Sequence, residues 1–117
     1  MKILVITAHP DDVDFGAGGT VATWVSEGHE VVYCLVTDGQ AGGSDNTITR
    51  EEMARIRRRE QTAAANILGV TELHWLGFPD GAVVPDFNLR REISAVIRIV
   101  KPDRVLTQSS ERRYDRI

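Results

Sequence analysis

An apolar run that stops at a proline places the strongest constraint on the fold. The run, ILVI at residues 3–6, is rich in β-branched side chains and too short for a helix, so it predicts a buried β-strand. Pro10 cannot donate a hydrogen bond to a sheet, and it favours an extended backbone at His9. We therefore expect His9, Asp11 and Asp12 just beyond the carboxyl end of the first strand, where open α/β sheets bind ligands.

Segments typical of strands and helices alternate along the rest of the chain. Further strands are expected at residues 30–36, 72–76 and 104–107. Helices are expected at residues 20–27, from a Thr49 cap to residue 68, and from an Asn88 cap to residue 100. Four strands separated by three helices imply βαβ crossovers and a mostly parallel sheet. The predicted fold class is α/β, a Rossmann-like three-layer αβα arrangement that stops after the fourth strand.

Composition bounds the functional class. With 117 residues, 42% of them hydrophobic and 26% charged, the chain suits one modest globular domain. A net charge of -3 argues against a general nucleic-acid binder, and no stretch has the length of a membrane span. The start lacks the pattern of a signal peptide, so a cytoplasmic location is expected. Cys34, the single cysteine, is expected to be a small buried apolar residue.

The segment HPDD at residues 9–12 carries the chemistry. Neutral imidazole and carboxylate oxygen both bind zinc, and an uncoordinated carboxylate beside the metal can take a proton from water. The segment therefore suits metal-assisted hydrolysis. A hydrogen-bonded turn is the alternative for His and Asp at the end of a strand, because Asp after Pro is common in turns.

This amino-terminal pattern resembles the start of the LmbE/PIG-L-type zinc-dependent N-acetylglucosamine deacetylases. The resemblance rests on the apolar strand, Ala-His-Pro-Asp-Asp and the glycine-rich segment that follows. It implies that His9 and Asp12 are ligands of one zinc ion (Zn2+) and that Asp11 is the general base that activates water. It implies a small-molecule or glycoconjugate substrate that contains N-acetylglucosamine. It also places strand one between strands two and four.

The same resemblance suggests two substrate contacts. Family members carry an Arg three residues before a Glu in the second helix, a pattern that falls here on Arg57 and Glu60. A surface ion pair is the alternative interpretation of that spacing. A Pro-Asp pair after the third strand makes Asp80 a candidate for binding a sugar hydroxyl, although Asp before Gly is also a common turn former.

The glycine-rich segment at residues 14–19 could instead indicate a nucleotide site. It lacks the G-x-G-x-x-G register, and the carboxylates just before it lie where a pyrophosphate would need donors. We therefore expect a loop whose glycines let the first helix pack close to the sheet.

The chain departs from the family pattern after strand four. The family's His-x-x-His-like segment, which supplies the third metal ligand, is absent from residues 108–117. We therefore expect residues 1–117 to be the amino-terminal part of a single deacetylase domain, inactive alone and a weak binder of zinc. Its exposed fourth strand could drive association into a homo-oligomer. The alternative function is a non-catalytic Rossmann-like module that binds a small ligand or a partner chain.

Overall fold

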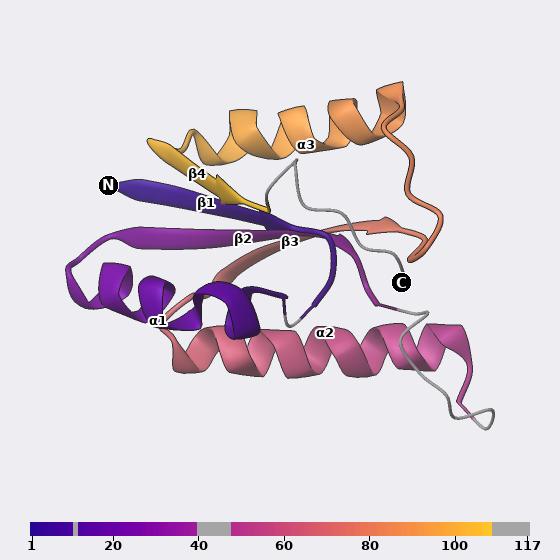
Figure 1. The fold of residues 1–117 in the computed structure, drawn as a ribbon, viewed down its shortest axis with the longest axis horizontal. Helices are drawn as coiled ribbons and strands as arrows, with labels where there is room; N and C mark the ends of the chain where they lie inside the picture. The colour runs from indigo at the N-terminus through magenta and orange to yellow at the C-terminus, as the bar shows by residue number, and fades with distance from the viewer. Residues whose placement is uncertain (11, 40–47, 109–117) are drawn as a thin grey trace.

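The computed structural model describes residues 1–10, 12–39 and 48–108, without the side chains of residues 13–16. Its strands form one parallel sheet in the order β3-β2-β1-β4 (Figure 1). The elements in chain order are β1 (Lys2–Thr7), α1 (Asp12–Ser26), β2 (Glu30–Thr37), α2 (Arg50–Ile67), β3 (Glu72–Phe78), α3 (Phe87–Val100) and β4 (Arg104–Thr107).

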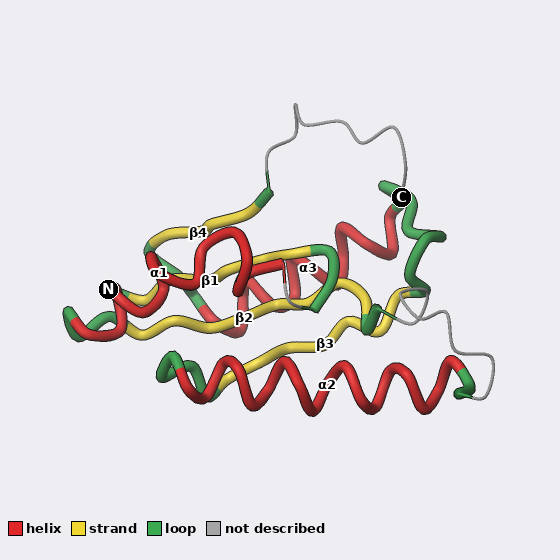
Figure 2. The backbone as a smooth tube through the Cα atoms, turned by 60° about the horizontal axis from the view of Figure 1, so that its bottom comes forward, coloured by secondary structure: helices red, strands yellow, loops and turns green. Residues whose placement is uncertain are grey.

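Helices cover both faces of this sheet. Figures 1 and 2 show α1 and α2 on one face and α3 on the other. Alternate strand residues point to opposite faces, so Ile3 and Val5 of β1 pack with α1 and α2, whereas Leu4 and Ile6 pack with α3. The predicted three-layer αβα architecture is confirmed.

The strand order defines where a ligand can bind. β1 pairs with β2 on one side and with β4 on the other, as expected. The chain thus moves outward from β1 in one direction through β2 and β3 and returns to the other side for β4. The carboxyl end of β1 is therefore the topological switch point of the sheet.

The central strand β2 is covered on both faces, as its continuous apolar sequence predicts. Residues Val31 to Thr37 are all buried, and Cys34 has no exposed surface. Burial raises the pKa of the Cys34 thiol to about 11, because the interior disfavours the charged thiolate. The interpretation of Cys34 as a small apolar core residue is confirmed.

The expected loop before the first helix is wrong. Helix α1 begins at Asp12, so Gly16, Gly18 and Gly19 are helical. A Cβ on Gly19 would have no atom within 4 Å, so close packing does not require a glycine there. Helix propensity alone argues against this segment, but Val21 and Trp24 pack α1 against the sheet, and tertiary packing outweighs propensity.

Two element boundaries also differ from expectation. Strand β3 continues past residue 76 to Phe78, with Gly77 at φ 75° and a shift in the pairing with β2. A glycine at positive φ lets the strand accommodate an irregularity of this kind. Helix α3 is capped by Asp86, whose side chain accepts a hydrogen bond from Leu89 N–H, rather than by Asn88.

The start of α2 matches its prediction. The Thr49 hydroxyl accepts a hydrogen bond from Glu52 N–H at 3.1 Å. The helix ends at Ile67, one residue before the predicted end, and Leu68 is its C-cap.

Strand β4 forms one edge of the described sheet. Within the described residues, β4 pairs with β1 alone, and Val105 and Ile99 are 45% and 68% exposed. No helix in the described ranges is both long and apolar enough to cross a membrane.

Candidate metal centre

The loop after β1 is held by the ends of the neighbouring strands. The Thr37 backbone N–H and side-chain hydroxyl both donate to the Ala8 carbonyl at 2.9 Å. From the other side, Gln108 after β4 accepts the Ala8 N–H at 3.1 Å through its side-chain oxygen. Thr37 of β2 and Gln108 after β4 both form hydrogen bonds with Ala8. These bonds anchor the backbone next to His9 at the switch point of the sheet.

His9 and Asp12 lie together on this loop. The His9 Nδ1 atom is 3.5 Å from the Asp12 Oδ2 atom, and the two side chains are 39% and 29% exposed. Asp12 Oδ2 also accepts hydrogen bonds from His9 N–H at 3.0 Å and from the Gln108 side-chain amide at 3.3 Å. The structure thus brings together the two residues that the sequence predicts as metal ligands.

Asp80 meets the same histidine from the loop after β3. Its Oδ1 atom is 2.7 Å from His9 Nε2, and its side chain is only 8% exposed. The sequence suggests Asp80 as a contact for a sugar hydroxyl. The structure brings Asp80 into contact with His9, and its role toward a substrate stays a prediction.

The geometry of His9 and Asp12 fits zinc. Two ligands of a tetrahedral zinc at roughly 2.0–2.2 Å lie about 3.4 Å apart, close to the observed 3.5 Å between Nδ1 and Oδ2. Within the described ranges, no group of three His, Cys, Asp or Glu side chains could hold a metal ion together. The distance between the two side chains is compatible with two of the ligands of such a site, and their role as metal ligands stays a prediction. Asp11, predicted as the general base, lies outside the described residues.

A cavity of about 400 Å³ opens beside His9 on the α3 side of the sheet. Its polar lining residues come from the ends of β1, β2 and β4, and include Thr7, Thr37, Thr107 and Gln108. Its apolar wall comes from α3 and the segment before it, with Val83, Leu89 and Ile93. A mixed cavity next to a histidine and a carboxylate is suited to a small polar ligand.

Arg57 lies at the edge of the same region. Its guanidinium is 3.6 Å from the Glu60 carboxylate, one turn along α2, and its side chain is 28% exposed. A Cβ built on Gly39 would lie 3.2 Å from Pro10 and 3.7 Å from the Arg57 side chain. Arg57 therefore approaches the loop that carries His9, and it also forms the ion pair that its spacing allows.

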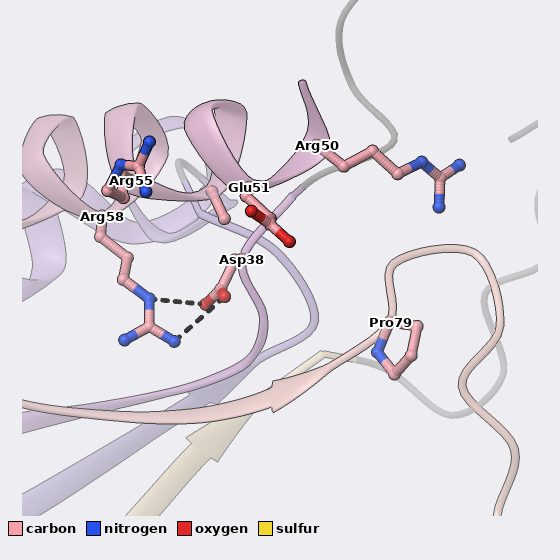
Figure 3. A pocket seen from close by; sticks show the side chains of 7 residues that line it. Asp38, Arg50, Glu51, Arg55, Arg58 and Pro79 are labelled. Atoms are coloured by element: carbon pink, nitrogen blue, oxygen red, sulfur yellow. Dashed lines mark hydrogen bonds and ion pairs between the residues drawn. The ribbon is translucent and has the colours of Figure 1, made fainter. Parts of the chain in front are cut away.

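The neighbouring arginine forms a contact that the sequence analysis does not identify. Arg58 donates two hydrogen bonds of 3.0 Å to the Asp38 carboxylate, and its guanidinium lies 5.1 Å from the Trp75 ring centroid. Figure 3 shows the pair at the wall of a second hollow of about 400 Å³ between α2 and Pro79. An Asp directly after β2 and an arginine-rich α2 are the sequence features that could have indicated an ion pair here. The sequence does not show which of the four arginines at residues 50–58 faces the sheet.

The other histidines lie elsewhere, as expected. His74 on β3 pairs with Glu72 at 2.8 Å, and His29, just before β2, contacts the amino terminus at 3.2 Å.

A comparison with protein families identifies the family of the chain. The model of the family described as "PIG-L: GlcNAc-PI de-N-acetylase" matches residues 4–115. The chain belongs to the PIG-L family. The resemblance drawn from the HPDD segment is therefore confirmed.

Relatives of the chain include deacetylases. The chain is 41% identical over 105 residues to the diacetylchitobiose deacetylase of Thermococcus kodakarensis, covering 90% of this chain and 39% of that protein. It is 35% identical over 111 residues to a probable N-acetyl-alpha-D-glucosaminyl L-malate deacetylase 2 of Bacillus cereus, covering 90% and 50%. The chain thus spans half or less of the length of these relatives.

Solved structures of other proteins share the fold of this chain. The N,N'-diacetylchitobiose deacetylase of Pyrococcus horikoshii superimposes with a TM-score of 0.87 at 36% identity, over 89% of this chain and 39% of that one. The 4-carboxy-2-hydroxymuconate hydratase GalB of Pseudomonas putida KT2440 also gives 0.87, at 28% identity over 97% and 49%. The same fold therefore hosts more than one reaction.

Proposed function

We propose that the protein containing this chain is a zinc-dependent amidohydrolase that removes the N-acetyl group from an N-acetylglucosamine-containing small molecule or glycoconjugate. The observation that carries the proposal is the pairing of His9 and Asp12 at zinc-ligand distance at the switch point of a PIG-L-family sheet. The deacetylase relatives support the reaction class. The cytoplasmic location stays a prediction.

Each site residue has a distinct role in this proposal. His9 and Asp12 would hold the metal, with a third protein ligand from outside the described residues. Bound zinc would polarise the acetyl carbonyl and acidify a water molecule. Asp11, next to Asp12 in the sequence, would accept the proton of the attacking water and could then return it to the leaving amine. Arg57 would contact a substrate oxygen through its fork of donors.

The cavity beside His9 supports binding of a small polar substrate. It joins hydroxyl and amide groups from the strand ends to an apolar wall from α3. An acetyl methyl group suits the apolar wall, and sugar hydroxyls suit the threonine side chains.

The test uses the protein at the length that its own cells produce, called the native protein below. Acetate release from N,N'-diacetylchitobiose is measured with added zinc, after chelation and after zinc is restored. Asp11→Asn should lower kcat by about 10²–10⁴-fold because the general base is lost, while zinc content stays near one per molecule. Arg57→Gln should raise KM with a smaller effect on kcat. The 117-residue chain alone should release no acetate.

Turnover that survives both chelation and Asp11→Asn would contradict the proposal. Stoichiometric zinc without turnover on any acetylated amino sugar would favour the non-catalytic binding module instead.

A hydratase is the second candidate, because GalB superimposes as well as the deacetylase from Pyrococcus horikoshii. Both reactions require activated water, so the same site could serve either. Incubation with 4-carboxy-2-hydroxymuconate, followed by its absorbance, separates them. Loss of that absorbance without acetate release from amino sugars would favour the hydratase.

A further inference from the structure

A polar contact holds the first half of α2 against the sheet. The buried residues of this helix, Gln61 and Ala65, both lie in its second half. In the first half, Arg58 donates two hydrogen bonds of 3.0 Å to the carboxylate of Asp38, directly after β2 (Figure 3). The Arg58 guanidinium also lies 5.1 Å from the ring centroid of Trp75 on β3. One side chain therefore connects α2 to two neighbouring strands.

The residue after Asp38 contacts the stem of the neighbouring arginine. Gly39 has φ 73°, and a Cβ built on it would lie 3.7 Å from Arg57 Cγ. The same Cβ would lie 3.2 Å from Pro10 Cδ, in the loop that carries His9. The Arg57 stem, the end of β2 and this loop thus meet at Gly39. The hydrogen bonds from Arg58 reach the chain one residue before this meeting point.

We propose that Arg58 is a positioning residue whose pair with Asp38 helps to fix the rotation of α2 on the sheet, so that Arg57 is directed at the substrate. Successive helix residues differ in direction by about 100°, so the contacts of Arg58 also set the direction of Arg57. The inference rests on the proposed function, because it takes Arg57 as the substrate contact.

The contacts of the two arginines differ in kind. The Asp38 side chain is 8% exposed, and two parallel bonds from Arg58 fix the plane of that guanidinium. Arg57 lies 3.6 Å from Glu60, whose side chain is 53% exposed, a pair typical of the surface. Arg58 is therefore committed to a buried carboxylate, which suits a residue that acts through its neighbour and not on the substrate itself.

The test measures kcat and KM of the native protein for acetate release from N,N'-diacetylchitobiose, at a temperature where every variant is folded. Arg57→Gln should raise KM about 10–100-fold, the worth of a hydrogen bond to a charged group. Arg58→Met should raise KM about 3–10-fold and leave kcat within about twofold, because a misdirected Arg57 weakens the same contact. Arg58→Lys should raise KM less, since its ammonium keeps a positive charge opposite Asp38. Zinc content should be unchanged in all three variants.

A double mutant separates positioning from a direct role. If Arg58 acts through Arg57, Arg58→Met has nothing left to misdirect once Arg57 is replaced. The double mutant Arg57→Gln, Arg58→Met should therefore match the KM of Arg57→Gln within about twofold. The matched control is Arg55→Met, because Arg55 is an exposed arginine of the same helix that forms no ion pair within the described residues. Its KM should equal that of the parent protein.

The outcomes distinguish this inference from the proposed function. If Arg57→Gln raises KM while both Arg58 variants keep the parent value, the inference is wrong and the proposed function stands. If Arg58→Met raises KM by the same factor with and without Arg57, its effect does not pass through Arg57, and the inference is again wrong. If the parent protein releases no acetate, or Arg57→Gln leaves KM unchanged, the proposed role of Arg57 fails and the inference with it. Should Arg58→Met not fold, Arg58→Lys in the same two backgrounds decides.

Discussion

The Arg58–Asp38 pair offers the sharpest test of how the carboxyl edge is stabilised. The Asp38 side chain is 8% exposed and accepts two parallel hydrogen bonds from Arg58, whose own side chain is 44% exposed. Replacing Arg58 by Met keeps the apolar stem and a good helix former but leaves the buried carboxylate without these donors.

The magnitude follows from this geometry. Breaking a fully buried ion pair costs roughly 3–5 kcal/mol, whereas an exposed pair contributes about 0–1 kcal/mol. Because Arg58 is half exposed, water can replace part of what Asp38 loses, so we expect a loss of about 2 kcal/mol. The guanidinium over Trp75, 5.1 Å from the ring centroid, adds about 0.5–1 kcal/mol. Arg58→Lys should lose about half as much, since an ammonium lacks the two-pronged geometry.

The assay is urea unfolding of the native protein and its variants, followed by circular dichroism. With a slope of roughly 1–2 kcal/mol per M, Arg58→Met should lower the midpoint by about 1–3 M. The control is Arg91→Met, which removes a pair of 3.7 Å whose side chains are 62% and 45% exposed, and should change stability by less than about 0.5 kcal/mol. The reasoning is refuted if Arg58→Met and Arg91→Met shift the midpoint equally. An Asp38→Asn, Arg58→Met double mutant that shows no coupling would refute it as well.

Further predictions concern the core and the glycines. Burial raises the pKa of Cys34 from 9.0 to about 11, so the folded protein holds a proton that the unfolded chain loses, and stability falls between about pH 9 and 11 by at most roughly 2–3 kcal/mol. Urea midpoints across this range should fall less steeply for Cys34→Ala than for the parent protein; equal slopes would contradict the assignment. Gly69→Ala should destabilise by roughly 1–3 kcal/mol, because its φ is +91° and the new Cβ would lie 2.6 Å from Val25. Gly19→Ala, inside α1 with open space around it, should stabilise by about 0.5–1 kcal/mol. Thermal midpoints that move in the same direction for both glycine variants would be inconsistent with these environments.

Local patterns were sufficient to predict much of the fold. A β-branched run followed by a proline located the end of β1, and continuous apolar sequence marked β2 as central. The Thr49 cap was predictable because a capping contact spans only three residues. The start of α1 was not, because its glycines argue against a helix and only the packing of the later α1 residues against the sheet favours one.

Which arginine faces the sheet could not be predicted from the sequence. Successive helix residues differ in direction by about 100°, so Arg57 and Arg58 point to different neighbours. Arg58 reaches Asp38 and Trp75, while Arg57 lies near Pro10 and Glu60. The choice depends on how α2 is rotated on the sheet, and that rotation is set by tertiary packing.

The contact between Asp80 and His9 lies furthest beyond sequence reasoning. β3 is separated from β1 by β2, so the strand order alone does not bring their loops together. β3 carries an irregularity near its end, where Gly77 has φ 75° and the pairing with β2 shifts between Leu35 and Thr37. Bulges of this kind redirect the residues that follow. The loop that follows this shift brings the Asp80 carboxylate to 2.7 Å from His9 Nε2, a contact that neither the Pro-Asp pair nor its spacing could reveal.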